Sequence, residues 1–303
     1  FSGLARYAGA GAPSMDLADS LDVSPDGRIY TARLRPGVRW HDEEPFSADD
    51  VVFTIRTIQD PEYQSPLRPN WQGVVVERLD DATVRFVLRQ PYAPFVENLT
   101  VGILPQHLWR RIPREAAVRS DLNLKPIGTG PYRFNKFSRR EDGRITSITL
   151  ARSKRYHREG PYLSEIRFVF YPDEDGLVAA YRRNEIDSFA FSSATHLDEL
   201  RRLDLDIREL KLAKVFGVFL NPGANPALGR SKIRQALAMA IDRERIIRET
   251  VAGGGTPADS AIPRGTFGFN PEVPPVPFDP DGAKALLAAD GWTDRDRDGV
   301  LEQ

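Results

Sequence analysis

The sequence contains no cysteine among its 303 residues. This absence excludes a disulfide framework, a thiolate metal site and a cysteine nucleophile. The sequence also lacks an apolar run of about 18 residues, the length that a membrane-spanning helix needs. No internal repeat is recognisable. These absences leave a chain whose stability must come from ordinary apolar packing, and its length is ample for a substantial core.

An excess of positive charge is lacking as well. Lys and Arg number 42 against 43 Asp and Glu, which gives a formal net charge of -1. A protein that binds nucleic acid usually carries a basic excess, and this sequence offers no basic stripe for an anionic membrane. The charged fraction of 28% and the hydrophobic fraction of 41% are typical of soluble globular proteins. The length alone suggests two or three domains.

The first half of the sequence alternates between strand and turn signals. Apolar residues at every second position from Tyr30 to Leu34 predict a half-buried strand. Ser47 with Asp50 three residues later predicts a capped helix that ends before Asp60. Hairpins are expected around Asp80-Asp81 and around Asp142-Gly143, and a further strand over residues 166–170. A helix is expected after Asp173.

The second half mixes helices with extended chain. The apolar run over residues 215–220 suits a buried central strand. Ser231 is expected to cap one long helix that ends at the glycines 253–255. A segment rich in proline, residues 257–280, should wrap without regular structure, and Asp279-Pro280 should begin another helix. Shorter elements are expected near residues 189–191 and after Thr195. This mixture of hairpins and strand-helix-strand units indicates an α/β protein with mixed sheets.

Two clusters of carboxylates are candidates for chemistry. His41, Asp42, Glu43 and Glu44 adjoin one another, but neighbours on a loop do not converge on one point, so a polar surface loop is the simpler interpretation. The aspartates Asp294, Asp296 and Asp298 precede Gly299, as in the first half of a calcium-binding loop. An acidic residue eleven positions after Asp294 would complete that loop, and the chain ends first. Calcium binding and a plain acidic loop therefore both stay open.

The other familiar signatures of catalysis are incomplete. The four histidines show no short metal-ligand spacing, and the Gly-Thr-Gly of residues 128–130 is too short for a phosphate-binding fingerprint. No nucleophile-elbow pattern surrounds a serine. The sequence therefore assembles no convincing active site, and it implies no cofactor.

Several longer segments, in contrast, form an ordered series that is spread over most of the chain. They are DLADSL at residues 16–21, LRPGVRWHD at 34–42, FSADDVVF at 46–53, IGTGPY at 127–132, NEID at 184–187 and IRQALAMAIDR at 233–243. In this order they resemble the extracellular solute-binding proteins, family 5, of peptide, nickel and oligopeptide ABC importers. The sequence departs from the family's usual pattern at Glu43-Glu44 and at Tyr156-His157, where altered local turns and an unchanged fold are expected.

The resemblance implies an α/β fold of the periplasmic-binding-protein-like type II, with mixed sheets in two lobes plus an extra domain. Residues 1–16 and 127–221 would form the first lobe, 17–126 the additional domain, and 222–303 the start of the opposing lobe. The family chain is longer at both ends, and this chain begins at Phe1 without a signal-peptide pattern. We therefore expect a fragment with a truncated opposing lobe, which binds ligand weakly because a cleft needs two walls.

The resemblance also implies a function. It predicts the substrate-binding component of an ABC importer, which captures a peptide or similar small solute in an inter-lobe cleft and delivers it to permease subunits in the inner membrane. The protein would be a monomer, periplasmic or extracellular, with a lipid anchor as one form of attachment, and would not be an enzyme. Strand ends that face the cleft suggest six ligand contacts: Ala190, Phe191, Ser192, Gly217, Phe219 and Asn221. For Phe191 and Phe219, a core position is the alternative.

Two other function classes remain open at this stage. The same module resembles the ligand-sensing half of a transcription regulator, which an upstream winged helix-turn-helix would reveal. A metal-dependent hydrolase that uses the carboxylates of residues 42–44 with His41 is a weaker alternative. The ligand could equally be a peptide, a sugar or a nickel chelate.

Overall fold

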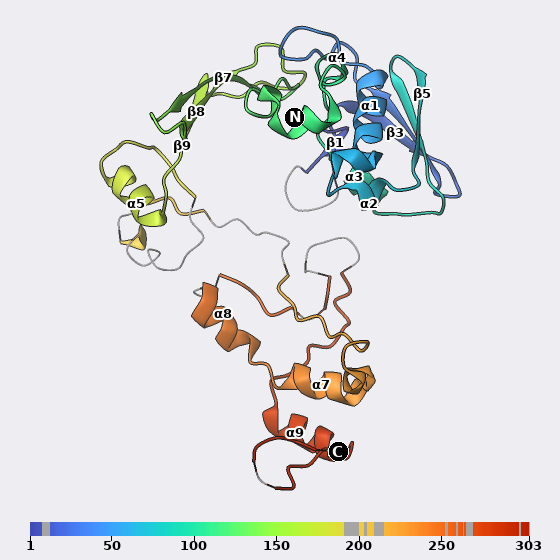
Figure 1. The fold of residues 1–303 in the computed structure, drawn as a ribbon, viewed down its shortest axis with the longest axis vertical. Helices are drawn as coiled ribbons and strands as arrows, with labels where there is room; N and C mark the ends of the chain where they lie inside the picture. The colour runs from blue at the N-terminus through green and yellow to red at the C-terminus, as the bar shows by residue number, and fades with distance from the viewer. Residues whose placement is uncertain are drawn as a thin grey trace. The chain divides into compact units, whose positions relative to one another are not determined.

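The computed structural model divides the chain into two compact units, Phe1–Phe189 and Ala190–Gln303. Figure 1 shows their elements, and each unit is described by itself. The described residues are 1–7, 13–190, 200–202, 205–208, 215–251, 254–258, 260–262, 264, 269–296 and 298–302. The predicted strand at 189–191 falls partly outside these residues, and the helix expected after Thr195 falls mostly outside them.

A four-stranded antiparallel sheet forms the centre of the first unit. Its spatial order is β3-β4-β6-β5. The register places Tyr30 opposite Phe86 and Ala32 opposite Val84, so alternate residues of both strands share one buried face. This confirms the predicted strand and the predicted hairpin around Asp80-Asp81. The strands span Ala18–Val23 (β3), Ile29–Leu34 (β4), Val75–Asp80 (β5) and Thr83–Val87 (β6).

Helix α1, Ala48–Gln59, lies against this sheet and buries Val51, Ile55 and Ile58. Its start follows the prediction, because the Asp50 carboxylate accepts a hydrogen bond of 3.0 Å from the Ser47 backbone N–H. The same carboxylate accepts from the Trp40 indole at 3.3 Å and from the Gln106 backbone at 2.8 Å. Burial raises the pKa of Asp50 despite these donors. One buried carboxylate thus joins three segments of the first unit.

The core beside the sheet is aromatic. The Trp71, Phe86 and Phe95 rings meet in tilted and edge-on contacts with centroids 5.5 to 6.0 Å apart. Each of these side chains is almost fully buried, and burial of such a side chain contributes about 1.5–3 kcal/mol. Two short helices, Arg68–Trp71 (α2) and Phe95–Asn98 (α3), contribute Trp71 and Phe95 to this core. The other short helices of the unit are Pro61–Tyr63 (η1), Gln106–Trp109 (α4), Arg114–Arg119 (η2) and Asp121–Asn123 (η3).

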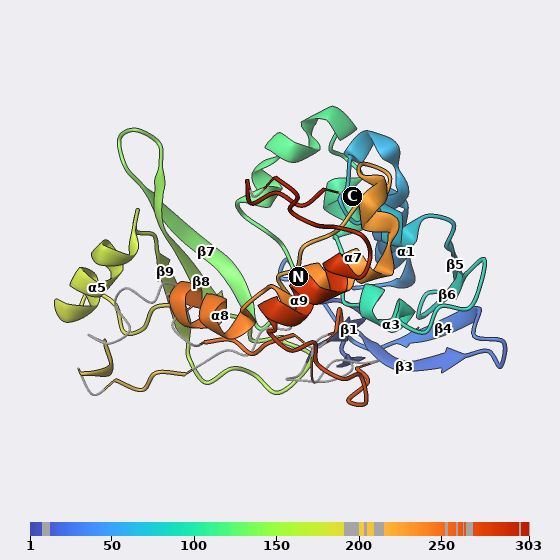
Figure 2. The same cartoon turned by 90° about the horizontal axis from the view of Figure 1, so that it is seen from below.

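The remainder of the first unit contains a strand pair and a second sheet. Strands β1, Ala5–Arg6, and β2, Ser14–Met15, pair antiparallel. The second sheet has the order β7-β8-β9, with bounds Tyr132–Arg139, Ile145–Arg152 and Glu165–Val169, and its long β7–β8 hairpin is clear in Figure 2. Gly143 takes a φ of 84° in the hairpin turn, as the Asp-Gly signal predicts. Helix α5, Glu174–Arg182, follows its predicted cap at Asp173.

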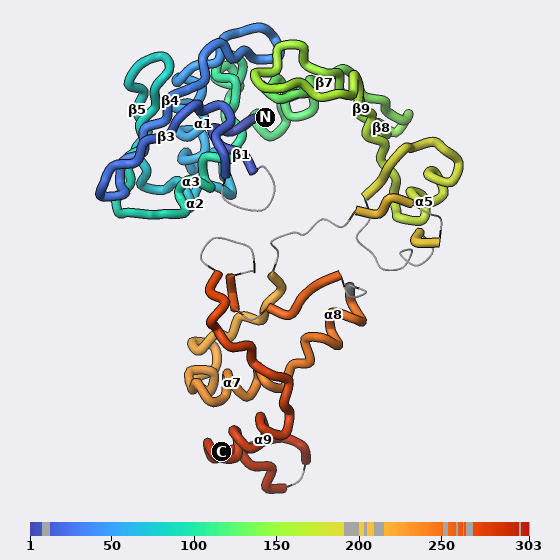
Figure 3. Tube along the Cα trace, turned by 180° about the vertical axis from the view of Figure 1, so that it is seen from behind, coloured from blue at the N-terminus to red at the C-terminus, as the bar shows by residue number. Residues whose placement is uncertain are grey.

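The regular elements with described bounds in the second unit are helices, and Figure 3 follows the path of this unit. They are η4 (Pro226–Gly229), α7 (Ser231–Met239), α8 (Arg243–Val251) and α9 (Pro280–Ala288). The prediction of one long helix capped by Ser231 is wrong. Arg230 occupies the cap position, and the helical conformation is interrupted between α7 and α8. Asp242 accounts for the break, because its side chain accepts from the Arg245 N–H and begins a new helix. The expected cap of α9 by Asp279 is confirmed.

The prediction of a buried central strand at residues 215–220 is also wrong. This segment carries no strand pairing in the described structure, and Phe216 and Phe219 are 87% and 99% exposed. An apolar run becomes a central strand only where a neighbouring strand pairs with its backbone. The described residues of the proline-rich segment, in contrast, form no helix or strand before Pro280, as predicted.

Candidate functional site

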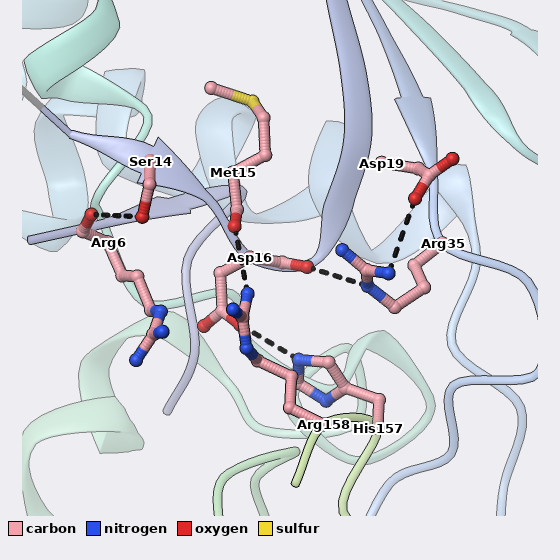
Figure 4. Close-up of polar contacts among 8 residues, drawn as sticks. All are labelled: Arg6, Ser14, Met15, Asp16, Asp19, Arg35, His157 and Arg158. Atoms are coloured by element: carbon pink, nitrogen blue, oxygen red, sulfur yellow. Dashed lines mark hydrogen bonds and ion pairs between the residues drawn. The ribbon is translucent and has the colours of Figure 1, made fainter. Parts of the chain in front are cut away.

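A buried polar cluster of the first unit surrounds Asp16, directly after β2 (Figure 4). The His157 ring lies in the loop after β8, and its Nε2 is 2.9 Å from the Asp16 carboxylate. The exposed fractions of the two side chains are only 4% and 5%. This hydrogen bond joins positions 141 residues apart in the sequence. A buried and hydrogen-bonded carboxylate of this kind holds the two segments in one fixed arrangement.

Arginines surround this pair. Arg158 donates to the Met15 carbonyl at 3.1 Å, and its guanidinium is 3.8 Å from the Asp16 carboxylate. Arg35 donates to the Asp16 carbonyl at 3.1 Å and forms an ion pair with Asp19 at 3.3 Å. Sequence analysis missed this cluster, because Asp16 and Arg35 belong to no chemical motif. The histidine at a position where the family usually has an aromatic residue was the signal that could have indicated it.

A second histidine, His41, forms hydrogen bonds to the Gly-Thr-Gly turn of residues 128–130. The His41 backbone N–H donates to the Gly128 carbonyl at 2.9 Å, and ring Nε2 lies 2.9 Å from the Gly130 carbonyl. Ring Nδ1 accepts from the Gly128 N–H at 3.2 Å, so the neutral ring satisfies both contacts with Nε2 as donor. Burial lowers the pKa of His41 below its ordinary value of 6.5, although the bond to Gly130 acts in the opposite direction. The turn therefore has a structural role.

The neighbouring carboxylates do not join His41 in one site. Asp42 pairs with His107 at 2.8 Å. Glu43 adopts a φ of 72° and pairs with Arg155 at 2.7 Å. Glu44 is exposed. The side chains thus turn towards different partners, which agrees with the simpler interpretation of a polar surface loop.

The six predicted ligand-contact residues belong to the second unit. Phe191 and Ser192 lie outside the described residues, and Ala190 is exposed. Gly217 and Phe219 lie in the exposed stretch 215–219, so Phe219 is not the core residue of the alternative interpretation. The Asn221 side chain accepts from the Gly223 N–H at 2.9 Å. Among the described residues, no hydrogen bond joins Ala190 to the 217–221 segment. The role of all six residues as ligand contacts therefore stays a prediction.

The structure brings the three candidate calcium ligands together. Oxygens of Asp294, Asp296, Asp298 and Glu302 all lie within 4.8 Å of one another. Glu302 was missed as a fourth member, because the expected acidic residue was eleven positions after Asp294 and Glu302 is only eight after it. An antiparallel bridge between Thr293 and Glu302 closes the loop and brings Glu302 back. Three of the four side chains are exposed, and calcium binding stays a prediction.

Comparison with known families decides the identity of the fold. The model of the bacterial extracellular solute-binding proteins, family 5 Middle, matches residues 12–302. The chain belongs to this family. The resemblance that the motif series carries is therefore confirmed. Among the described residues, no helix combines the length and the apolar character that crossing a bilayer requires.

Two curated relatives in this family are named for peptide binding. The chain is 30% identical to the dipeptide-binding protein of Escherichia coli over 91% of its own length and 54% of the relative's. It is 28% identical to the oligopeptide-binding protein AppA of Bacillus subtilis, over 95% of this chain and 53% of that protein. The chain thus spans about half the length of the curated relatives it matches.

Solved structures of related binding proteins are similar to this chain in fold, again over a part of their length. NikZ from Campylobacter jejuni, in complex with Ni(L-His), is 29% identical with a TM-score of 0.78, over 99% of this chain and 60% of that one. AppA from Bacillus subtilis, in complex with a nonapeptide, is 26% identical with a TM-score of 0.73, over 100% of this chain and 60% of that one. The chain has the mixed α/β structure of these family members over a part of their length.

Proposed function

We propose that this chain is part of the substrate-binding component of an ABC importer and that it captures a peptide or a similar small solute. The observation that carries the proposal is the family match over residues 12–302. The relatives named for dipeptide and oligopeptide binding favour a peptide. The relative with Ni(L-His) keeps a metal chelate as the second candidate solute.

The proposed architecture is a two-lobed, type II binding protein with an additional domain. The sheet β3-β4-β6-β5 and α1 lie within residues 17–126, which supports their assignment to the additional domain. The sheet β7-β8-β9 lies within residues 127–221, the proposed continuation of the first lobe. Residues 222–303 belong to the opposing lobe. Solute binding would stabilise closure of the two lobes by hinge motion, because only the closed state contacts the solute from both sides.

The proposed ligand contacts centre on Phe219, whose side chain is 99% exposed. An exposed aromatic ring offers apolar and stacking contact to a solute. Gly217 and Asn221 on the same segment would offer backbone and amide groups, and Ala190, Phe191 and Ser192 would contribute from the other stretch. The proposed partners are permease subunits of the inner membrane. A location in the periplasm or outside the cell accords with the family's description as extracellular. The proposed oligomeric state is a monomer.

The proposal is tested by calorimetric titration of the protein expressed from its complete reading frame, with dipeptides, a nonapeptide and Ni(L-His) as probes. We expect saturable binding of at least one probe without turnover. Phe219→Ala should weaken this binding about tenfold, because the ring contributes apolar contact. Tyr162→Ala is the matched control, because this ring is 93% exposed but belongs to the first unit and to no proposed contact.

Two results would contradict parts of the proposal. Hydrolysis of a peptide probe by the pure protein would overturn the assignment as a binding protein. Equal losses of affinity in Phe219→Ala and Tyr162→Ala would leave no specific role for the 217–221 segment and would remove Phe219 from the site.

A further inference from the structure

A pocket with a volume of about 510 Å³ lies in the first unit beside the buried Asp16–His157 pair. This volume lies within the usual range of small-molecule sites, about 300–1,000 Å³. The pocket is formed by β1, by the residue after β4 and by the loop after β8, and it is lined by Arg6, Arg35, Tyr156, His157, Arg158 and Glu159. Three of its lining side chains are guanidinium groups, which are always charged in proteins.

Two of the three guanidinium groups already have partners. Arg35 is paired with Asp19, and Arg158 contacts the Met15 carbonyl and the Asp16 carboxylate. These contacts fix the positions of both side chains. They also neutralise much of the positive charge on this side of the pocket.

Arg6 differs from both. Among the described residues no carboxylate forms an ion pair with it, and its Nε is buried without a hydrogen-bond partner. The preceding residue Ala5 is buried in the core, so the alternation of β1 turns Arg6 to the opposite side, where Figure 4 shows it extending beside Asp16. An unsatisfied buried donor destabilises the folded state, and the destabilisation is larger when the group is charged. Such a donor is expected where an acceptor completes the site.

Tyr156 and Glu159 define the remainder of the pocket. Burial raises the pKa of the Tyr156 phenol, with the Asp16 carboxylate acting in the same direction, so the phenol stays a neutral hydrogen-bonding group. The Glu159 side chain is exposed and is not paired with Arg6. Its negative charge opposes a bound anion from the rim, where solvent screens it.

We propose that this pocket binds a small oxyanion, a carboxylate or phosphate group of a soluble molecule, with Arg6 as its principal ligand side chain. A planar guanidinium donates two parallel hydrogen bonds to such a group, and the buried Nε of Arg6 is a donor without a partner. The site lies wholly within Phe1–Phe189, so it is independent of the proposed solute contacts in the second unit.

The test is calorimetric titration of the 303-residue chain with sodium phosphate and, separately, with sodium succinate at constant ionic strength. We expect saturable binding of at least one probe. Arg6→Gln should weaken it about tenfold or more, and Arg6→Lys should weaken it severalfold, because the ammonium group cannot reproduce the planar fork. Arg140→Gln, an exposed arginine at the end of the β7–β8 hairpin, is the matched control and should change nothing. Glu159→Gln should tighten binding.

The two probes separate the sources of the oxyanion. Saturation by phosphate alone assigns a phosphate-bearing molecule, and saturation by succinate alone assigns a carboxylate. Absence of saturation by both probes up to about 10 mM would overturn the proposal. Equal affinities of wild type and Arg6→Gln would overturn it as well. If Arg6→Gln does not fold, Glu159→Gln decides, and an unchanged affinity in that variant contradicts the site.

Discussion

The two units of this chain differ in how they bury their apolar side chains. In Phe1–Phe189, one continuous core extends from Leu4 to Ile103 and includes four fully buried aromatic side chains, Trp40, Trp71, Phe86 and Phe95. In the described part of Ala190–Gln303, Leu200, Ile233, Ala236 and Ala283 are buried. Several large apolar side chains are exposed there: Phe216, Val218, Phe219, Ile246, Val276 and Phe278. The sequences of both units are rich in apolar residues, so composition alone does not separate them.

The difference shows that an apolar stripe needs a partner before it stabilises a fold. Helix α1 places its stripe on a sheet and buries Val51 and Ile55 almost completely. Helix α7 packs against α9 and buries Ile233 and Ala236, but Leu237 stays 41% exposed. Short helices gain most of their stability from such packing and little from propensity. The first unit is therefore expected to dominate the stability of the chain.

Truncation of a core ring should have the largest effect. Phe86→Ala removes a fully buried ring that contacts Trp71 and Phe95, and we expect a loss of about 3–5 kcal/mol in the free energy of unfolding. Phe216→Ala is the matched change in the second unit, and it should stay within about 0.5 kcal/mol. Urea denaturation followed by tryptophan fluorescence measures both. A loss in Phe216→Ala as large as in Phe86→Ala would show that the exposed ring is packed in solution.

A smaller effect is expected from pH, and it should be confined to the first unit. Because burial lowers the pKa of His41 below 6.5, the unfolded state binds more protons than the folded state in slightly acidic solution. The stabilising contribution is thus present above pH 6.5 and is lost as the pH falls through the lower pKa of the folded state. Urea midpoints measured from about pH 5.5 to about pH 7.5 should rise with pH.

The variant His41→Gln should flatten this rise, because glutamine does not titrate. His107→Gln provides the control, since that histidine pairs with Asp42 at the surface and its loss should leave the His41 contribution in place. An identical pH profile in wild type and His41→Gln would show that the Gly-Thr-Gly contact does not depend on protonation.

The smallest effect is expected at the acidic loop of the second unit. If Asp294, Asp296, Asp298 and Glu302 bind calcium with the millimolar affinity of extracellular modules, 2 mM calcium should stabilise that unit by about 0.6 kcal/mol. Thermal melting followed by circular dichroism, with and without a chelator, measures the shift. Asp296→Asn should abolish it, and Asp281→Asn, in the first turn of α9, should preserve it. A shift that survives in Asp296→Asn would contradict the calcium prediction.

Short sequence motifs correctly predicted the elements that depend on hydrogen bonds and turns between residues close in the sequence. The Asp50 and Asp279 caps and the Asp-Gly hairpin depend on residues at most three positions apart, and all three are present. The period-two pattern of residues 30–34 also predicted the buried side chains correctly, because Tyr30, Ala32 and Leu34 are all buried. The prediction was wrong at residues 215–220, because pairing partners far along the chain decide whether an apolar run is a strand. It was wrong between α7 and α8, where one side-chain cap at Asp242 outweighed helical periodicity.

The candidate sites also differ in how far the sequence predicts them. Asp294, Asp296 and Asp298 form a spacing that the sequence displays, and only their fourth companion, Glu302, required the bridge to Thr293. The Asp16–His157 pair and the pocket beside it could not be predicted, because they join positions 141 residues apart. The position of Arg6 could not be predicted from alternation of apolar and polar residues, because β1 contains only two residues.

The sequence by itself determined the family, through an ordered series of motifs, and most of the capped helices and hairpins. It also excluded disulfide and thiolate chemistry through the absence of cysteine. Only the tertiary structure decided which apolar segments are buried and which charged side chains meet. The physical reason is that capping and alternation act over a few residues. Burial and charge pairing, in contrast, depend on what the rest of the chain brings within contact distance.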